Sequence, residues 1–206
     1  MGWEHLVRCI PVPGGRGAVQ RLLYRSIDEE SWYRCPGPLV QYPAGTVPWI
    51  RLHLIGPYGP GIPDGLKETI ETSDFIVRAV LPRGAIAAAL APMDLLVLPY
   101  NPRESYLNLA SPTKLFEYIG AAKPILCTKC KSSMDIDDEG GIVYVDYSPE
   151  EMAEAIDRLI NRPEVREEMG RALCRIRARH TWAERAGRVY RGLASIRRGD
   201  RAFSHP

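Results

Sequence analysis

The feature that most constrains the fold of this chain is the alternation of short apolar runs with helical segments from residue 50 onward. The clearest run, Leu95–Leu98, is stopped by Pro99, which is typical of a strand buried on both faces of a parallel sheet. Further strands are predicted at 50–55, 75–81, 124–127 and 142–145. Helices are predicted at the alanine-rich segment 84–90 and at 112–122. Strands that alternate with helices predict an α/β fold with a parallel sheet and helices on both faces.

Helix signals are strongest in the last third of the chain. Ser148–Glu151 has the pattern of a capping box and precedes an apolar stripe that runs to Ile160. Pro163 starts a second amphipathic helix, whose stripe ends at Ile176. A second capping box, Thr181–Glu184, predicts the start of a third helix.

The first fifty residues contain six prolines and show few periodic segments. His5–Val12 is predicted as a strand and Ala18–Arg25 as a short helix, whereas Arg34–Pro48 has four prolines and no clear period. The length of 206 residues accommodates one domain, or one domain and a short appendage. We therefore predict a poorly defined N-terminal segment, one α/β domain and a loose tail, over residues 1–48, 49–196 and 197–206.

The composition excludes several classes of protein. Apolar residues make up 45% and charged residues 25% of the chain, which is close to the globular average and argues against wholesale disorder. The longest apolar stretch, Gly84–Met93, is far shorter than the roughly 20 residues that span a bilayer, and we expect no signal peptide. The five cysteines do not suggest a disulfide framework, so we expect a reduced, cytoplasmic setting.

The net charge of +2 selects no partner, but the charge is unevenly distributed. Between Arg171 and Arg201 the chain has ten arginines and two acidic residues, a local charge of +8. Most of these arginines fall on the polar faces of amphipathic helices, which favours a solvated surface. The alternative is peripheral contact with anionic lipid at the inner face of a membrane. Nucleic-acid binding is disfavoured because few aromatic residues are interspersed.

Three segments are predicted to reach the carboxyl edge of the sheet, where parallel α/β proteins bind ligands. They are the glycine-rich loop Gly56–Gly61 and the longer segments Pro99–Ser111 and Thr128–Gly141. Long loops in compact domains are often functional. The glycine-rich loop allows close approach of a ligand or another backbone, but it lacks the G-x-G-x-x-G spacing and is equally consistent with a simple turn.

The predicted helix 112–122 carries the most chemical information. Ser111 and Pro112 predict its start, with the serine as N-cap and the proline at the first helical position. Lys114 and Glu117 are three residues apart, so they share a face near the positive end of the helix dipole. A lysine for phosphate and a carboxylate for ribose hydroxyls would form a nucleotide-sugar site. The alternative is a surface Lys–Glu pair.

The run Ser111–Ile125, with the sequence SPTKLFEYIGAAKPI, resembles the signature helix of glycosyltransferase family 4 (group 1). Further segments match the order of that family's C-terminal, donor-binding domain: Leu54–Pro57, Asp94–Tyr100, Ile142–Val145, Ser148–Glu150 and Thr181–Arg185. The resemblance covers about residues 50–195. It implies a single Rossmann-like half of the GT-B fold, in which two such domains face each other across a cleft.

The resemblance implies a transferase that moves a sugar from a UDP-, GDP- or ADP-linked donor with retention of configuration. The donor-binding residues that it implies are Glu117, Lys114, Ser111, Pro112, Tyr100 and Gly56. Glu117 would bind the ribose hydroxyls, Tyr100 would line the cleft after its strand, and Gly56 would approach the base or the ribose. No metal and no cofactor are implied, because positive residues and helix dipoles stabilise the leaving diphosphate.

The chain departs from the family pattern at two places. Leu109 stands eight positions before Glu117, where many members have a first glutamate. The one candidate for the family's phosphate loop is Gly14–Gly17, where Arg16 is the candidate phosphate ligand and no lysine follows. The catalytic residue is therefore left unassigned, and the sequence leaves open whether the acceptor domain comes from a partner chain or was lost by truncation. The alternative function is a non-catalytic nucleotide-sugar-binding or scaffolding module.

Other patterns are interpreted as structural. Asp135–Asp137 is an Asp-x-Asp, but no strand with a nucleotide context precedes it, so we assign no metal site. Cys127 and Cys130 have the spacing of redox and zinc motifs, but the sequence has no second close pair, so buried structural thiols are predicted. His53 alternates within a strand and His180 precedes a helix cap, and both are predicted as structural.

Overall fold

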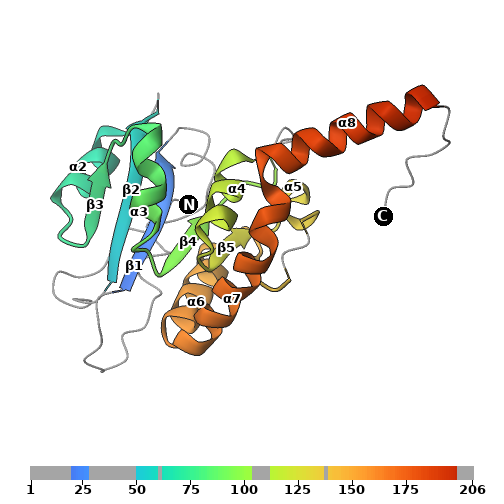
Figure 1. Ribbon diagram of the computed structural model, residues 1–206. Helices are drawn as coiled ribbons and strands as arrows, with labels where there is room; N and C mark the ends of the chain where they lie inside the picture. Colours follow the sequence, from blue (N-terminus) through green and yellow to red (C-terminus); the bar gives the residue numbers. More distant parts are fainter. Residues whose placement is uncertain (1–19, 28–49, 60–61, 104–111, 137–138, 199–206) are drawn as a thin grey trace.

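The computed structural model describes residues 20–27, 50–59, 62–103, 112–136 and 139–198, and Figure 1 shows a twisted sheet with helices around it. The described residues form a six-stranded sheet of β1 (Gln20–Ile27), β2 (Ile50–Tyr58), β3 (Ile76–Ala79), β4 (Leu95–Leu98), β5 (Ile125–Thr128) and β6 (Ile142–Val145). Every pairing between these strands is parallel. The predicted α/β fold with a parallel sheet is therefore confirmed.

The strands lie in the order β3-β2-β1-β4-β5-β6, which is the order of a doubly wound, Rossmann-like sheet. The chain moves outward from β1 through β2 to β3 and then returns to the other side of β1 as β4. The order therefore reverses between β1 and β4, which pair from Leu22 with Leu95 to Tyr24 with Val97. Sheets of this type bind their ligands beyond the carboxyl ends of the strands at this reversal.

β1 corrects the interpretation of the N-terminal part. The sequence pattern predicts a short helix over Ala18–Arg25, but Gln20–Ile27 is a central strand of the sheet. β1 pairs with β2 on one side and with β4 on the other, and these non-local hydrogen bonds outweigh a weak local pattern. The sheet thus includes part of the segment 1–48. The predicted strand His5–Val12 and residues 28–49 lie outside the described residues, so the exact start of the domain stays a prediction.

The helices cover the sheet on two faces and then extend past it. In the described residues they are α2 (Asp64–Thr72), η2 (Arg83–Ala85), α3 (Ile86–Leu90), α4 (Thr113–Ala121), α5 (Lys131–Met134), α6 (Pro149–Ile160), α7 (Pro163–Ile176), η4 (Arg177–His180) and α8 (Trp182–Arg198), where η denotes a 3-10 helix. The sequence patterns predict α3, α4, α6, α7 and α8, but not α2 or α5.

The serine and threonine hydrogen bonds of both predicted capping boxes are formed. The Ser148 hydroxyl accepts from the Glu151 backbone N–H at 3.3 Å, and the Thr181 hydroxyl accepts from the Glu184 backbone N–H at 3.1 Å.

In contrast, α4 starts one residue later than predicted. Pro112 has an extended ψ of 108°, so it occupies the N-cap position instead of the first helical position.

Two hydrophobic clusters lie on opposite faces of the sheet, and β4 contributes to both. Leu95 and Val97 join the cluster that contains α6, whereas Leu96 and Leu98 join the cluster that contains α3 and α4. This alternation reflects the two-residue period of a strand. All four side chains are buried, as predicted for a parallel strand covered on both faces.

The predicted glycine-rich loop Gly56–Gly61 begins later than expected, because β2 continues to Tyr58. Gly56 has a φ of 148°, which L side chains rarely adopt, and the register with β1 shifts between Arg25 and Ile27. The glycine thus lets the strand continue through an irregularity. Residues 60–61 lie outside the described residues.

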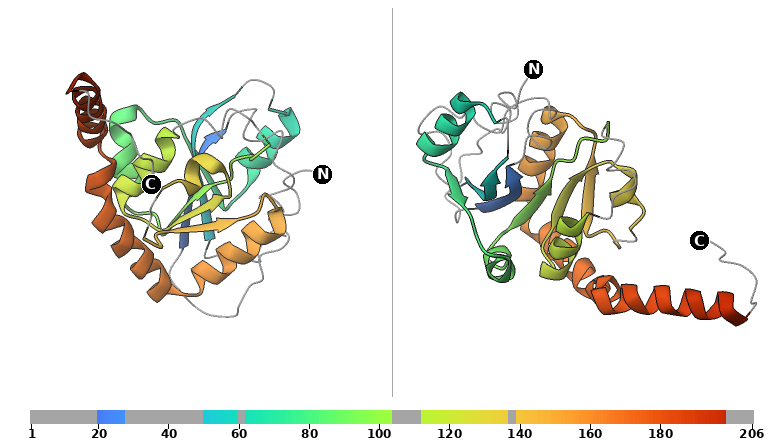
Figure 2. Two further views of the ribbon diagram at one scale, coloured as in Figure 1. Left: turned by 90° about the vertical axis from the view of Figure 1, so that its right-hand side faces the viewer. Right: turned by 90° about the horizontal axis from the view of Figure 1, so that it is seen from above.

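α8 leads away from the sheet, and Figures 1 and 2 show it projecting beyond the other helices. No side chain in the part 182–197 is buried. The helix includes Arg197 and Arg198, the first two residues of the predicted tail 197–206. Among the described residues, no helix combines the length and the apolar character that a membrane span requires.

Candidate functional site

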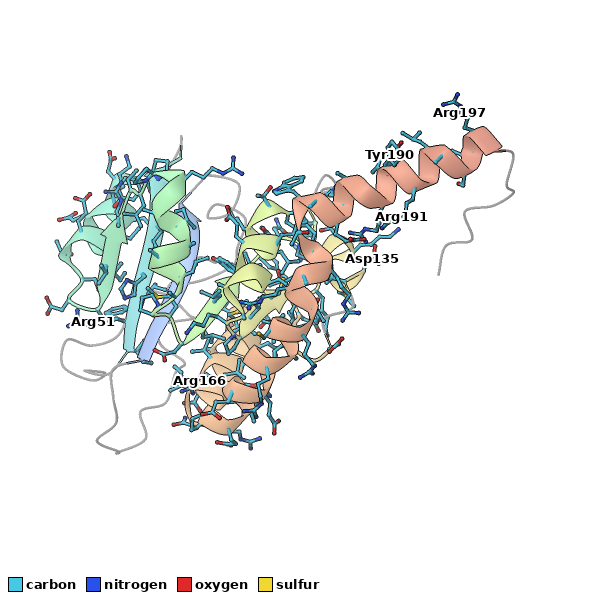
Figure 3. All side chains as sticks on the ribbon, viewed as in Figure 1. Arg51, Asp135, Arg166, Tyr190, Arg191 and Arg197 are labelled. Carbon is cyan, nitrogen blue, oxygen red and sulfur yellow. The ribbon has the colours of Figure 1, made fainter. Side chains whose placement is uncertain are left out.

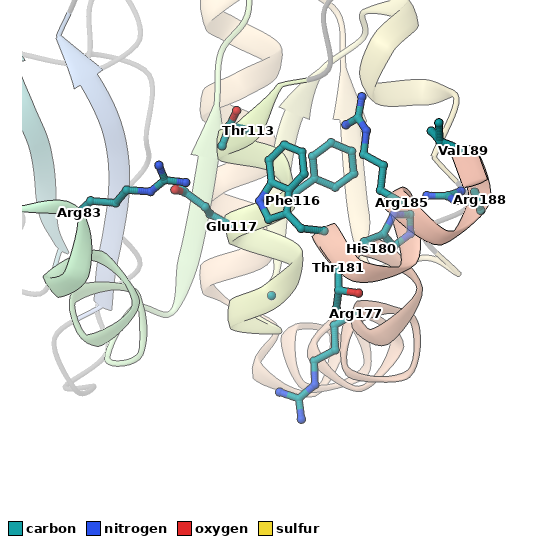
Figure 4. A pocket seen from close by; sticks show the side chains of 12 residues that line it. Arg83, Thr113, Phe116, Glu117, Arg177, His180, Thr181, Arg185, Arg188 and Val189 are labelled. Atoms are coloured by element: carbon teal, nitrogen blue, oxygen red, sulfur yellow. The ribbon is translucent and has the colours of Figure 1, made fainter. Parts of the chain in front are cut away.

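A pocket of about 650 Å³ opens between three segments that are far apart in the chain. Its walls come from η2, from α4 and from the junction of η4 with α8 (Figure 4). This volume lies in the range of pockets that hold cofactors and small ligands.

The first two walls start at the carboxyl edge of the sheet. η2 comes shortly after β3, and α4 is the helix that follows β4. In a doubly wound sheet these connections carry the ligand-binding groups. The pocket therefore lies on the side of the molecule where this topology places binding sites.

The third wall is placed by the packing of α7 against α4. A Cβ atom at Gly170 of α7 would stand 3.2 Å from the carbonyl oxygen of Ala122, just after α4, so the glycine allows a close approach. Leu173 and Ile176 of α7 share a hydrophobic cluster with Leu115 of α4. Because η4 and α8 follow α7 directly, this packing brings them alongside α4.

The pocket is strongly positive. It is lined by Glu117 and by the four arginines Arg83, Arg177, Arg185 and Arg188. Figure 4 shows Arg83 and Glu117 pointing toward one another from different walls. Guanidinium groups donate hydrogen bonds to phosphate oxygens, and a carboxylate accepts them from hydroxyl groups. The arrangement therefore suits an anionic ligand that also carries hydroxyls.

Aromatic side chains complete the lining. The rings of Phe116 and His180 lie with their centroids 5.7 Å apart and their planes at 32°. The Arg185 guanidinium carbon lies 5.5 Å from the centroid of the Trp182 ring, within the range of a cation–π interaction. The Trp182 side chain is 67% exposed, so its ring can receive a planar group of a ligand.

Among the described residues predicted to bind the donor, Glu117 lines this pocket. Lys114 is partly buried on the same helix, and Pro112 is buried before its first turn; neither belongs to the lining. Ser111 lies outside the described residues, as does Arg16 of the predicted phosphate loop. Of these predicted residues, Glu117 therefore lines the pocket, and Lys114 and Pro112 lie close to Glu117 in the chain.

Tyr100 and Gly56 follow or end their strands at the same edge of the sheet but do not line the pocket. The carbonyl oxygen of Tyr100 accepts a hydrogen bond from the Thr128 hydroxyl, which ties the segment after β4 to the end of β5. The Tyr100 ring packs against the cluster around α4.

Sequence reasoning missed two of the three walls. Arg83 stands near the predicted helix 84–90 without any motif, and Trp182 is predicted only as part of an apolar stripe. His180 is predicted as structural, yet its ring lines the pocket. The match of Thr181–Arg185 to the family pattern is the signal that could have found the third wall.

The two thiols near the end of β5 are free and buried, as predicted. The Cys130 Sγ atom lies 3.1 Å from the Ser133 Oγ atom. A hydrogen bond with Cys127 lowers the pKa of the Cys130 thiol to about 5, and the Ser133 hydroxyl acts in the same direction. The same hydrogen bond, together with burial, raises the pKa of the Cys127 thiol.

Asp135 of the Asp-x-Asp pattern is exposed on the surface (Figure 3), and Asp137 lies outside the described residues. Within the described ranges, no group of three or more His, Cys, Asp or Glu side chains is arranged to hold a metal ion.

The family of the chain follows from its sequence as a whole. The model of the glycosyl transferase-like family matches residues 45–191, which is more than two thirds of the chain and contains the entire lining of the pocket. The chain belongs to this glycosyl transferase-like family. No curated protein sequence matches the chain.

Solved glycosyltransferase structures share the fold. HepE from Anabaena, crystallised with UDP, is 14% identical with a TM-score of 0.66, over 86% of this chain and 49% of HepE. WaaG, a glycosyltransferase involved in lipopolysaccharide biosynthesis, is 18% identical with a TM-score of 0.58, over 79% of this chain and 44% of WaaG. Trehalose-6-phosphate synthase is 14% identical with a TM-score of 0.52, over 86% of this chain and 47% of the synthase.

This chain spans about half the length of each of these proteins. The predicted resemblance to GT-B glycosyltransferases is confirmed, and the chain has the Rossmann-like fold of a GT-B protein. Membership of glycosyltransferase family 4 within that class stays a prediction.

Proposed function

We propose that this chain is the donor-binding half of a retaining GT-B glycosyltransferase. The observation that carries the proposal is the position of Glu117 in a pocket lined by four arginines, beyond the carboxyl end of β4. The family match and the shared fold support a sugar transferase. Retention of configuration is supported by the likeness to trehalose-6-phosphate synthase, which was studied for glycosyl transfer with retention.

The ligand that fits these groups is a nucleoside diphosphate sugar. The Glu117 carboxylate accepts hydrogen bonds from the two ribose hydroxyls. The guanidinium groups of Arg83, Arg185 and Arg188 donate to the diphosphate, and the nearby N-terminus of α4 adds the positive end of its dipole. The base stacks on Trp182 or Phe116. HepE was crystallised with UDP and with UDP-glucose, so a uridine donor is the first to test.

In this proposal the chain supplies electrostatic stabilisation of the leaving group. As the bond between the sugar and the diphosphate breaks, negative charge grows on the diphosphate, and prearranged arginines stabilise it without a metal ion or another cofactor. Lys114 adds a positive charge near the first turn of α4. The acceptor and the residue that assists its attack belong to a second Rossmann-like half. Donor contacts of Ser111, Pro112, Tyr100, Gly56 and Arg16 stay predictions.

The test is calorimetric titration of the chain with UDP, GDP and ADP. Glu117→Ala removes the hydroxyl acceptor and should weaken binding of the preferred nucleotide about tenfold or more. Glu154→Ala, which removes an exposed carboxylate from α6, is the matched control and should leave affinity unchanged. Lack of binding of all three nucleotides at millimolar concentration, or equal affinity of Glu117→Ala, would refute the site.

A second candidate function is a non-catalytic nucleotide-sugar-binding module. It is favoured by Leu109, which stands where many family members have a first glutamate. The two functions are distinguished by incubating the chain with UDP-glucose and a candidate acceptor-domain chain. Release of UDP with transfer of glucose supports the enzyme, whereas tight binding without release supports the module.

A further inference from the structure

The third wall of the pocket, formed by η4 and the start of α8, has no buried side chains of its own. η4 contains no buried residue, and no side chain in the part 182–197 of α8 is buried. Ile176, at the end of α7, is the buried side chain that precedes this wall. Hydrophobic packing therefore brings α7 alongside α4, whereas the orientation of η4 and α8 depends on other contacts.

One of these contacts is a carboxylate that binds two arginines of the same turn. Glu139, in the connection between α5 and β6, accepts a hydrogen bond from Arg175 Nε at 2.9 Å and another from Arg179 Nη2. The two arginines belong to the last turn of α7 and to η4. The hydrogen bond from Arg175, together with that from Arg179, lowers the pKa of the Glu139 carboxyl, which is therefore charged at neutral pH.

The backbone of Glu139 points to a role for its side chain. Its φ of 51° lies in the left-handed region, which glycine adopts without steric cost and glutamate does not. The next residue, Gly140, has a φ of 84° and is a glycine, as this region favours. A residue in such a conformation persists where the surrounding structure holds it, and the contacts that hold Glu139 are its two arginines.

The same turn presents residues to the pocket. Arg175 and Arg179 are four residues apart, so they lie on one face of the turn. Arg177 is two residues from each of them and falls near the opposite face, where it lines the pocket. At the end of the turn, His180 places its ring against that of Phe116 on α4. Because α8 follows directly, the rotation of this turn also sets the direction of α8.

We propose that Glu139 is a positioning residue of the donor site: its carboxylate holds η4 and the start of α8 in the orientation that forms the third wall. The inference rests on the proposed function, in which Arg185 and Arg188 of α8 bind the diphosphate. Glu139 does not belong to the lining of the pocket, so it acts through Arg175 and Arg179.

Two other roles of the carboxylate predict different effects on binding. If Glu139 acted only through its charge, its removal would strengthen the binding of an anionic nucleotide, because an acidic group near a positive pocket repels the ligand. If it contributed only to fold stability, a folded variant would bind the nucleotide as the wild type does. A positioning residue predicts weaker binding from a variant that is fully folded.

The test is calorimetric titration of the full chain and its variants with UDP, GDP and ADP. Glu139→Gln and Glu139→Gly should each weaken binding about fivefold or more, because charge-assisted hydrogen bonds from the third wall are loosened. The matched control is Glu167→Gln, which removes the same charge from a carboxylate that pairs with Arg171 on α7. This control should bind as the wild type does.

Glu139→Gly separates binding from stability. Glycine relieves the left-handed backbone, and this gain offsets the loss of two exposed ion pairs. Urea unfolding of this variant should therefore give about the wild-type free energy, although its nucleotide affinity falls. Loss of affinity without loss of stability is the signature of a positioning role.

A second readout needs no nucleotide. The rings of Phe116 and His180, with centroids 5.7 Å apart, should give proton NOEs in the free wild type and in Glu167→Gln. Both Glu139 variants should lose these NOEs, because η4 is no longer held. If the wild type binds none of the nucleotides, the proposed donor site is wrong, and the NOEs then decide whether Glu139 positions η4.

Two outcomes overturn the proposal. The first is persistence of the NOEs between Phe116 and His180 in both Glu139 variants. The second is binding by both variants that equals or exceeds that of the wild type, while Glu117→Ala still weakens it. In that case the donor site stands, and Glu139 has no part in positioning it.

Discussion

At the scale of single residues, Cys127 of β5 and Cys130, the N-cap residue of α5, form a hydrogen-bonded pair. The Cys127 hydrogen bond holds the pKa of the Cys130 thiol at about 5, below its ordinary value of 9.0. A group with a depressed pKa contributes stability that is complete above the unfolded pKa and is lost as the pH falls through the folded pKa. The Cys130 thiolate therefore stabilises the fold increasingly between about pH 5 and about pH 9.

We predict that Cys130→Ser flattens the pH dependence of stability in this window. The difference in unfolding free energy between wild type and variant should grow by about 1 kcal/mol per pH unit from about pH 6 to about pH 8. Urea unfolding at several pH values measures it. Cys174→Ser removes an exposed thiol outside the pair and should keep the wild-type slope. If the unfolding free energy of Cys130→Ser depends on pH with the same slope as that of the wild type, Cys130 is protonated in the folded chain.

At the scale of elements, α4 ends in a conformation that its sequence does not favour. Ala122 has φ 52° and ψ 40°, the left-handed conformation of a helix C-cap, which glycine adopts without steric cost. Ala122→Gly should therefore raise the free energy of unfolding by about 0.5–1 kcal/mol in urea titrations. Ala121→Gly, one residue earlier inside α4, should lower it by about 1 kcal/mol. If both variants changed the free energy of unfolding in the same direction, the left-handed conformation of Ala122 would be contradicted.

The elements that could be predicted are those with strong local signals. The Leu95–Leu98 run, the Ser148 cap and the apolar stripe of α6 specify their structures over a few residues. β1 could not be predicted, because its strand conformation depends on pairing with β2 and β4. α2 was missed because it has nine residues and Ile70 is its one buried side chain, so its apolar face is small. Local sequence patterns are therefore sufficient to predict the helices and strands whose buried apolar face is large.

At the scale of the whole molecule, the candidate site is assembled from residue 83 on η2, residues within 113–120 on α4 and residues within 177–189 on η4 and α8. The sequence could predict α4 and Glu117 because the family motif lies on one helix. It could not predict Arg83 or Arg188, because only the packing of η2 and α8 around α4 brings these side chains together. A pocket made by three segments has no local signature in the sequence.

This assembly predicts that the nucleotide contacts opposite walls at once. Arg83→Ala on η2 and Arg188→Ala on α8 should each weaken nucleotide binding about tenfold, because each removes a charge-assisted hydrogen bond to the diphosphate. Binding should also weaken with salt in the wild type and less so in the variants. Arg158→Ala, an exposed arginine of α6, is the control and should bind as the wild type does. Calorimetric titration measures the nucleotide affinity of the three variants and of the wild type. If Arg83→Ala alone weakens binding, the ligand occupies the η2 side of the pocket only.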